Sequence, residues 1–306
     1  MICTADLAIH RLAQKTDSLL NDRNFTCDYG RLEPVSPAIR RIVAPNPGPF
    51  TFYGTGTYVV GRGEVAVIDP GPALAEHVDA LLAALDGERV THILITHTHI
   101  DHSPAAAALK AATGAPSFGF GPHGKIGDTG EFGADLEFRP DRRLADGDAV
   151  EGPGWRLEAV HTPGHASNHL CFAFAAERAL FSGDHVMGWS TTVVTPPDGD
   201  MAAYMRSLDR LRAREDAIFW PTHGGPIRES ASHLQELIAH RRARRAAILA
   251  ALGSGPLRPQ GIVPAVYRDL DPRLVGAAAQ SVLAHLIELE AEGLVCRQEE
   301  RWARRG

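Results

Sequence analysis

The chain has 306 residues, of which 44% are apolar and 22% charged, so it can form one large globular domain or a large and a small one. A net charge of −6 disfavours a dedicated polyanion-binding protein. Charged residues interrupt the first 20 positions and the four cysteines form no C-x-x-C pair. We therefore expect reduced thiols, no secretory signal, no membrane-spanning segment and a cytoplasmic location.

Strand and helix patterns alternate from Ile39 onward. Strands are predicted for the β-branched and apolar runs at 57–60, 65–69, 90–96, 155–160, 169–174, 179–181 and 218–220. Helices are predicted at 73–85, 103–112 and 201–212. Ser103 is positioned to cap the second of these helices, and the Gly-, Asp- and Pro-rich segment at 119–148 is expected on the surface. The alternation indicates two sheets enclosed by helices.

The pattern changes after Pro226. Three helices are predicted, at 228–252, 262–267 and 273–292, and the third has an apolar stripe at Val275, Ala279, Val282, Leu286 and Leu289. Segments 294–296 and 301–303 can pair as a two-stranded wing, so the outline is that of a winged helix. Residues 231–306 contain 11 basic and 8 acidic residues, a net of +3, whereas the preceding part has a net charge of −9.

The densest chemical signal is the run His97-Thr98-His99-Ile100-Asp101-His102, which follows the predicted strand at 90–96. In an extended loop alternate side chains face the same way, so His97 and His99 can bind one ion. Asp101 shares their parity, and His102 is offset toward a second ion. Crowded imidazoles need a cation to draw them together, so this run predicts a metal site.

Three further candidate ligands follow predicted strands. His165 ends the sequence T-P-G-H, Asp184 ends S-G-D, and His223 lies in T-H-G. Each is next to a glycine-bearing turn. This repeated placement at strand ends is what a site assembled from distant segments requires.

Through these motifs the chain resembles the metallo-β-lactamase superfamily. The sequences N-P-G-P (46–49) and G-T-G-T-Y (54–58) resemble the lactamase-beta-2-like group within it, as does the winged-helix segment after His240. The resemblance implies an α/β fold, an αββα sandwich with a small C-terminal winged-helix-like domain. The implied parts are an irregular N-terminal extension at 1–38, a catalytic domain at 39–230 and the winged-helix-like domain at 231–306. Gly56 departs from the group, which usually has Asn there, so substrate contacts are expected to differ.

The resemblance also implies a ligand set. One ion would be bound by His97, His99 and His165, a second by Asp101, His102 and His223, and Asp184 would bridge them. An anionic bridge offsets the repulsion between two cations about 3.5–4 Å apart. Nitrogen-rich ligation suits zinc, so two zinc ions per chain are expected, with iron or manganese as alternatives.

The reaction implied by such a centre is hydrolysis. Two ions lower the pKa of a bridging water toward neutrality and stabilise the oxyanion that develops on the substrate. Asp101 can also orient the attacking water, which makes it the predicted catalytic residue. His185 is a candidate substrate contact, whereas His169 is expected to support the site or to be structural.

Two substrate classes remain open. Small carboxylic esters, thioesters or lactones are favoured, because the catalytic part is acidic and lacks aromatic residues interleaved with basic ones. Single-stranded RNA is the alternative, supported by the winged-helix outline and by a cluster of arginines that could neutralise phosphates, at Arg241, Arg242, Arg244 and Arg245.

Other classes are also weighed. Two alternatives stay open: a mononuclear-iron persulfide dioxygenase and a DNA-binding regulator. The superfamily's di-iron electron-transfer members carry Glu at the position of His99, so that class is disfavoured. We expect residues 231–306 to cover the mouth of the site or to form a contact in a homo-oligomer, and we expect no membrane partner.

Overall fold

The computed structural model describes residues 20, 22–125, 133–268 and 270–305. Most of the predicted irregular extension at 1–38, namely 1–19 and 21, therefore lies outside the described residues. Within that extension, Glu33–Pro34 forms the short strand β1, which pairs antiparallel with β2.

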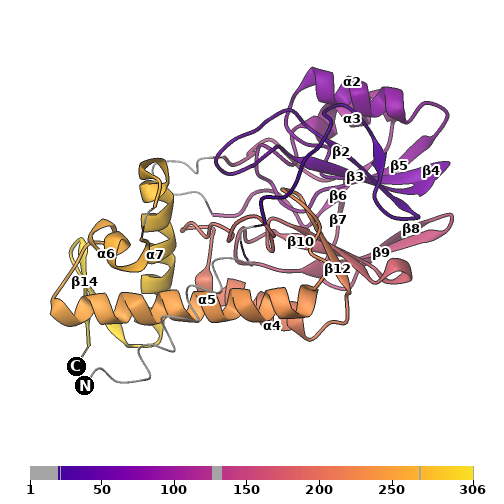
Figure 1. Ribbon diagram of the computed structural model, residues 1–306. Helices are drawn as coiled ribbons and strands as arrows, with labels where there is room; N and C mark the ends of the chain where they lie inside the picture. The colour runs from indigo at the N-terminus through magenta and orange to yellow at the C-terminus, as the bar shows by residue number, and fades with distance from the viewer. Residues whose placement is uncertain (1–19, 21, 126–132, 269, 306) are drawn as a thin grey trace.

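Two β-sheets form the centre of the larger part of the molecule (Figure 1). The first contains, in spatial order, β1, β2 (Ile39–Val43), β3 (Gly56–Arg62), β4 (Glu64–Ile68), β5 (Arg89–Leu94), β6 (Ser117–Gly119) and β7 (Arg142–Arg143). The second contains β12 (Ile218–Pro221), β11 (Ala179–Gly183), β10 (Leu170–Phe174), β9 (Trp155–His161) and β8 (Ala149–Gly152). The pair β11–β12 is parallel, and the rest of the second sheet is antiparallel.

The strands are apolar on both faces, because each sheet packs against the other sheet on one face and against helices on the other face. On β3, Tyr58 and Val60 face the core between the sheets, whereas Val59 faces the core under the helices. On β10, Phe172 packs in the core between the sheets and Cys171 in the core under the helices on the other side. This double burial explains why the strands read as continuous apolar runs.

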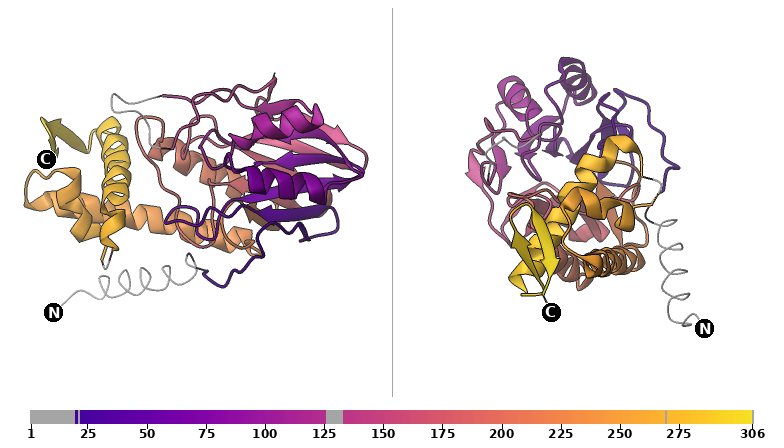
Figure 2. Two further views of the ribbon diagram at one scale, coloured as in Figure 1. Left: turned by 90° about the horizontal axis from the view of Figure 1, so that it is seen from above. Right: turned by 90° about the vertical axis from the view of Figure 1, so that its left-hand side faces the viewer.

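Helices cover the outer faces of both sheets (Figure 2). Helices α2 (Ala75–Ala84) and α3 (Ala105–Thr113) lie over the first sheet, and α4 (Met201–Arg212) and α5 (Ser230–Ala251) cover the second. The result is the predicted αββα sandwich. The sequence had suggested that Ser103 caps α3, but it does not. Its hydroxyl instead donates to the buried carboxylate of Asp135 at 2.5 Å.

The C-terminal residues build a smaller unit around the end of α5 (Figure 1). Its helices are η2 (Leu252–Ser254), α6 (Pro259–Val266), η3 (Pro272–Leu274) and α7 (Val275–Ala291), and its ribbon is β13 (Val295–Gln298) with β14 (Arg301–Arg304). This is the predicted winged-helix order. The predicted stripe on α7 is correct except at its first position, since Val275 is exposed and the other four side chains are buried in this unit's core.

One helical stretch, Pro272–Ala291, is long and apolar enough to cross a membrane by length and composition, with a mean hydropathy of 1.2. No membrane-spanning segment was expected from the sequence. Val282, Leu286 and Leu289 of this stretch lie in the apolar core of the C-terminal unit, and Ala284 packs with the core beside α4. Burial within the protein accounts for its apolar composition.

Candidate metal centre

Four segments that follow strands bring the predicted ligands together. The loop after β5 carries residues 97–102, and the segments after β9, β11 and β12 carry His165, Asp184 and His223. Among the described residues, three groups of side chains have ligand atoms within 4.8 Å of one another: His97, His99 and His165; His97, His102 and Asp184; Asp101, His102 and His223. Every predicted metal ligand belongs to at least one of these groups.

Three imidazoles converge in the first group. The Nε2 atom of His165 lies 3.2 Å from Nε2 of His97 and 3.1 Å from Nδ1 of His99. The same His97 and His99 nitrogens are 2.8 Å apart. Three nitrogens at this spacing point their lone pairs at a common region, which suits a cation with nitrogen ligands.

Carboxylates join imidazoles in the other two groups. Nε2 of His223 lies 3.1 Å from Oδ2 of Asp101 and 3.3 Å from Oδ1 of Asp184. Nε2 of His102 lies 3.5 Å from Oδ2 of each of the two aspartates. Oδ2 of Asp184 is also 3.8 Å from Nε2 of His165, so this carboxylate lies between the group of His97, His99 and His165 and the group of Asp101, His102 and His223.

Unsatisfied buried atoms show that these residues fit a metal. In the described part of the chain, Nε2 of His102, Nε2 of His223 and Oδ1 of Asp184 are buried without a hydrogen-bond partner. Buried polar atoms in native proteins are almost always paired. A cation bound between these atoms would satisfy all of them at once.

The other ring nitrogens have fixed partners. Nδ1 of His102 lies 2.9 Å from Oδ2 of Asp69, Nδ1 of His165 lies 2.7 Å from the carbonyl of Val193, and Nδ1 of His223 lies 3.1 Å from the carbonyl of Gly54. Such contacts fix the ring orientation and the tautomer of a metal-binding histidine. They leave Nε2 of each ring facing the centre.

Asp69 holds one predicted ligand, His102, in place and had not been singled out from the sequence. It is 1% exposed and accepts four hydrogen bonds: from the backbone N–H of Thr96 at 2.8 Å, the Thr96 hydroxyl at 2.7 Å, the Thr222 hydroxyl at 3.1 Å and Nδ1 of His102. The available signal was its place at the end of β4, in the sequence I-D-P-G, beside the strand that leads to His97.

The sequence matches the family described as "Metallo-beta-lactamase superfamily" over residues 51–223. The chain belongs to this superfamily. Residues 259–302 match the "Beta-lactamase associated winged helix domain". Membership places the chain among the metallo-β-lactamase-fold hydrolases, whose fold implies divalent metal ions.

Curated relatives of this metallo-β-lactamase-fold chain include fungal proteins. The chain is 34% identical over 224 residues to "Lactamase-like protein adaB" of Aspergillus niger, across 72% of this chain and 66% of the relative. It is 31% identical over 273 residues to the "Atrochrysone carboxyl ACP thioesterase" of Aspergillus chevalieri, across 83% of this chain and 82% of the relative.

Solved structures share the fold over most of the chain. A metallo-beta-lactamase family protein from Thermus thermophilus has a TM-score of 0.75 and 27% identity, and covers 89% of this chain and 100% of its own. A beta-lactamase domain protein from Burkholderia ambifaria has a TM-score of 0.79 at 24% identity, over 95% of this chain and 98% of its own. The second likeness concerns the fold alone.

The electrostatics of this metallo-β-lactamase centre differ between its two halves. Burial lowers the pKa of His165 to about 4, and it also lowers that of His97, so this half offers neutral nitrogen donors. At His223, burial lowers the pKa, but Asp184 and Asp101 outweigh it and raise the value to about 10. The carboxylates therefore create a strongly negative local field, which favours a bound cation.

Two other histidines near the centre are interior residues. His185 is 0% exposed, its ring packs 4.6 Å from that of Tyr204, and burial lowers its pKa to about 3. His185 was predicted to contact the substrate, but its side chain has no exposed surface through which it could do so. His169 is also fully buried, with Nδ1 2.9 Å from the Thr162 hydroxyl and its ring 5.1 Å from that of His97.

Gly56, the departure from the group's motif, lies beside the segment that carries His223. Its N–H donates to the carbonyl of Thr222 at 2.7 Å. A Cβ atom here would meet that carbonyl oxygen at 3.0 Å and Cδ of Arg41 at 3.2 Å. A larger residue would therefore require the Arg41 side chain to move.

Proposed function

We propose that this protein is a dinuclear zinc hydrolase that cleaves thioesters of small acyl groups. The observation that carries the proposal is the pair of ligand groups joined by Asp184, with buried ligand atoms that have no other partner. Histidine-rich ligation with two carboxylates suits zinc. The proposed first ion is held by His97, His99 and His165, the second by Asp101, His102 and His223, and Asp184 bridges them.

When bound, two such ions supply an activated water at neutral pH and a positive field for developing negative charge. The protein holds its ligands rigidly, because Asp69, Val193 and Gly54 fix three of the rings. Asp101 is the proposed proton acceptor. Its side chain is 22% exposed while the rings of His102 and His223 are at most 1% exposed, so Asp101 is the member of this group that incoming water can reach.

A thioester suits this site better than a bond with a poor leaving group. A thiol has a pKa of about 8.5, so it leaves as a thiolate with little need of a proton donor. Nothing on the chain is then required as a separate general acid. Asp101 needs only to take the proton from water.

Apolar side chains on both sides of the centre favour an acyl substrate. Ile100 lies within the ligand loop and is 50% exposed, and Leu136, on a segment paired with that loop, is 43% exposed. On the His223 side, Phe50 and Tyr53 are 46% and 38% exposed and lie in the hairpin that ends at Gly54. Exposed apolar groups beside a catalytic centre bind apolar substrate parts.

The arginines that had supported RNA as a substrate are engaged within the protein. Arg241 is 2% exposed, Arg244 donates to the carbonyl of Val266, and Arg245 pairs with Glu292. Of the four, Arg242 alone is exposed. This weakens the case for a phosphate-binding track along α5.

Relatives suggest how the acyl group is presented. Several fungal relatives, including those of Aspergillus chevalieri and Aspergillus fumigatus, are named atrochrysone carboxyl ACP thioesterases. We therefore extend the proposal to acyl groups carried as thioesters on an acyl carrier protein.

The test compares three substrates with the zinc-loaded protein: acyl-pantetheine thioesters, acyl thioesters of an acyl carrier protein, and labelled single-stranded RNA. The wild type should hydrolyse the thioesters, as should the control Asp79→Ala, which changes an exposed carboxylate on α2. Asp184→Ala should not hydrolyse them. RNA should stay intact. Cleavage of RNA that depends on Asp184 would refute the thioesterase proposal in favour of a nuclease, and a protein that hydrolyses neither would refute both.

A further inference from the structure

Helix α5 carries a buried arginine, Arg241. Arg241 is 2% exposed, stacks over the ring of Tyr204 with 5.0 Å between its Cζ atom and the ring centroid, and donates through Nη2 to the carbonyl of Thr192. No carboxylate among residues 20, 22–125, 133–268 and 270–305 lies within ion-pair distance of it, and its Nε atom has no partner there. A buried guanidinium without a counter-ion is destabilising. Such a cost calls for a compensating role.

The contacts of Arg241 lead to two proposed metal ligands. Thr192, whose carbonyl Arg241 holds, donates its hydroxyl to the carbonyl of Asp184 at 2.6 Å and to that of His185 at 3.1 Å. The next residue, Val193, presents its carbonyl to Nδ1 of His165 at 2.7 Å. The segment that Arg241 holds therefore touches Asp184 through one residue and His165 through the next.

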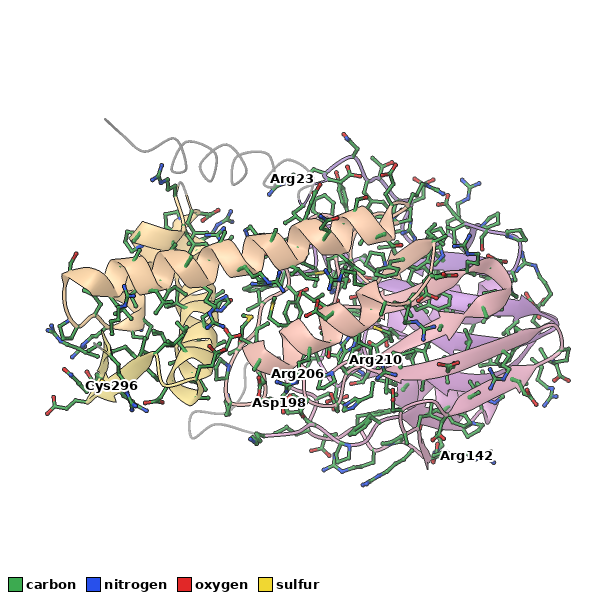
Figure 3. All side chains as sticks on the ribbon, turned by 90° about the horizontal axis from the view of Figure 1, so that it is seen from below. Arg23, Arg142, Asp198, Arg206, Arg210 and Cys296 are labelled. Carbon is green, nitrogen blue, oxygen red and sulfur yellow. The ribbon has the colours of Figure 1, made fainter. Side chains whose placement is uncertain are left out.

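Tyr204 provides a second connection. Its ring lies under the Arg241 guanidinium, and its hydroxyl donates to the carbonyl of His185 at 3.0 Å. The residue next to Asp184 is thus held by Thr192 and by Tyr204, and Arg241 contacts both of these. Figure 3 shows α5 running beside α4, the helix that carries Tyr204, and on into the C-terminal unit.

We propose that Arg241 is a positioning residue of the metal centre, which fixes Asp184 and His165 through Thr192, Val193 and Tyr204. The inference rests on the proposed metal centre and adds a connection to α5. One helical turn further along α5, Arg245 pairs with Glu288 and Glu292 of the C-terminal unit. The same helix therefore anchors the smaller unit and orients the ligands of the larger one.

The test measures zinc affinity by competition with a chromogenic chelator, and the visible spectrum of the cobalt-substituted protein. Arg241→Met removes the donor and keeps the apolar stem, Arg241→Lys keeps the charge, and Arg242→Met is the matched control on the exposed face of α5. We expect a loss of zinc affinity of about 10-fold and an altered cobalt spectrum in Arg241→Met, with no change in the control. Arg241→Lys should recover part of the affinity, because an ammonium can still donate to Thr192.

Thr192→Val keeps the test decisive if Arg241→Met does not fold. It removes the hydroxyl that holds Asp184 and leaves the helix untouched, so it should lower zinc affinity to a similar degree, and combining it with Arg241→Lys should cost less than the sum of the two. A lower melting temperature with unchanged zinc affinity and cobalt spectrum would overturn the positioning role. Failure of the wild type to bind zinc would instead overturn the proposed function.

Discussion

Replacing Asp69 with asparagine tests the support of the metal centre at one buried carboxylate. Its two oxygens accept hydrogen bonds from His102, Thr222 and two groups of Thr96. The asparagine amide keeps one acceptor oxygen and replaces the other carboxylate oxygen with an NH2 donor. In either orientation, at least one of the existing donors then faces an N–H group.

The size of the effect follows from which donor is lost. If the amide oxygen replaces Oδ2, the buried N–H of Thr96 loses its partner, which costs about 1–3 kcal/mol of unfolding free energy. If it replaces Oδ1, Nδ1 of His102 faces the new N–H, and the ring must move its proton to Nε2, the atom that faces the centre. Loss of such a supporting contact lowers metal affinity by about 10- to 100-fold.

Chelator competition gives the zinc affinity, and urea denaturation of the metal-free protein gives the unfolding free energy. The matched control is Asp79→Asn, on the exposed face of α2. An Asp69→Asn protein whose zinc affinity stays within about twofold of the control, and whose unfolding free energy also matches the control, would contradict the role assigned to this carboxylate.

Three further predictions concern other parts of the molecule. Gly164→Ala should lower the unfolding free energy by more than about 2 kcal/mol, because the new Cβ would lie 2.3 Å from Cα of Tyr204. The control Gly147→Ala is also at positive φ but in open space, so it should lower the unfolding free energy by only about 1 kcal/mol. Equal losses for the two variants in urea denaturation would refute the clash. Burial, and then the charges of Arg244 and Arg241, lower the pKa of His240 to about 3. As pH falls below about 6.5, the unfolded state binds a proton at His240 and the folded state does not, so the unfolding free energy should fall by about 2 kcal/mol between pH 7 and 5 because of this group. In urea denaturation across this range, the unfolding free energy of His240→Gln should depend less steeply on pH than that of the wild type. Finally, Arg242→Glu should leave thioester hydrolysis unchanged, and a large loss of kcat/KM in a steady-state assay would restore α5 as a substrate surface.

The sandwich was predictable because its pattern is local. The predicted runs 65–69 and 169–174 are apolar except at Asp69 and His169, and the structure places strands on their apolar parts because both sheet faces are buried. Helix 201–212 matches α4 residue for residue. The failures were at positions where a tertiary contact decides the outcome. Ser103 binds Asp135 instead of capping α3, and Val275 lies before the part of α7 that enters the core.

The convergence of the seven candidate ligands was predictable from motif and strand-end position, and the structure brings them together. Their support was not predictable, because it depends on contacts between distant segments. Asp69 reaches Thr222 across 153 positions, and Arg241 reaches Thr192 across 49. The cluster at 241–245 showed the opposite error, since its charge suggested a surface role and the fold buries its first member.

We propose that two zinc ions bound at these seven residues drive thioester hydrolysis. The most direct measurement is a zinc titration of the metal-free protein, following hydrolysis of an acyl-pantetheine thioester at each step. Activity should rise with added zinc, reach its plateau at two equivalents per chain, and be absent at every step in Asp184→Ala. Full activity without zinc, or a plateau that Asp184→Ala also reaches, would contradict the proposal.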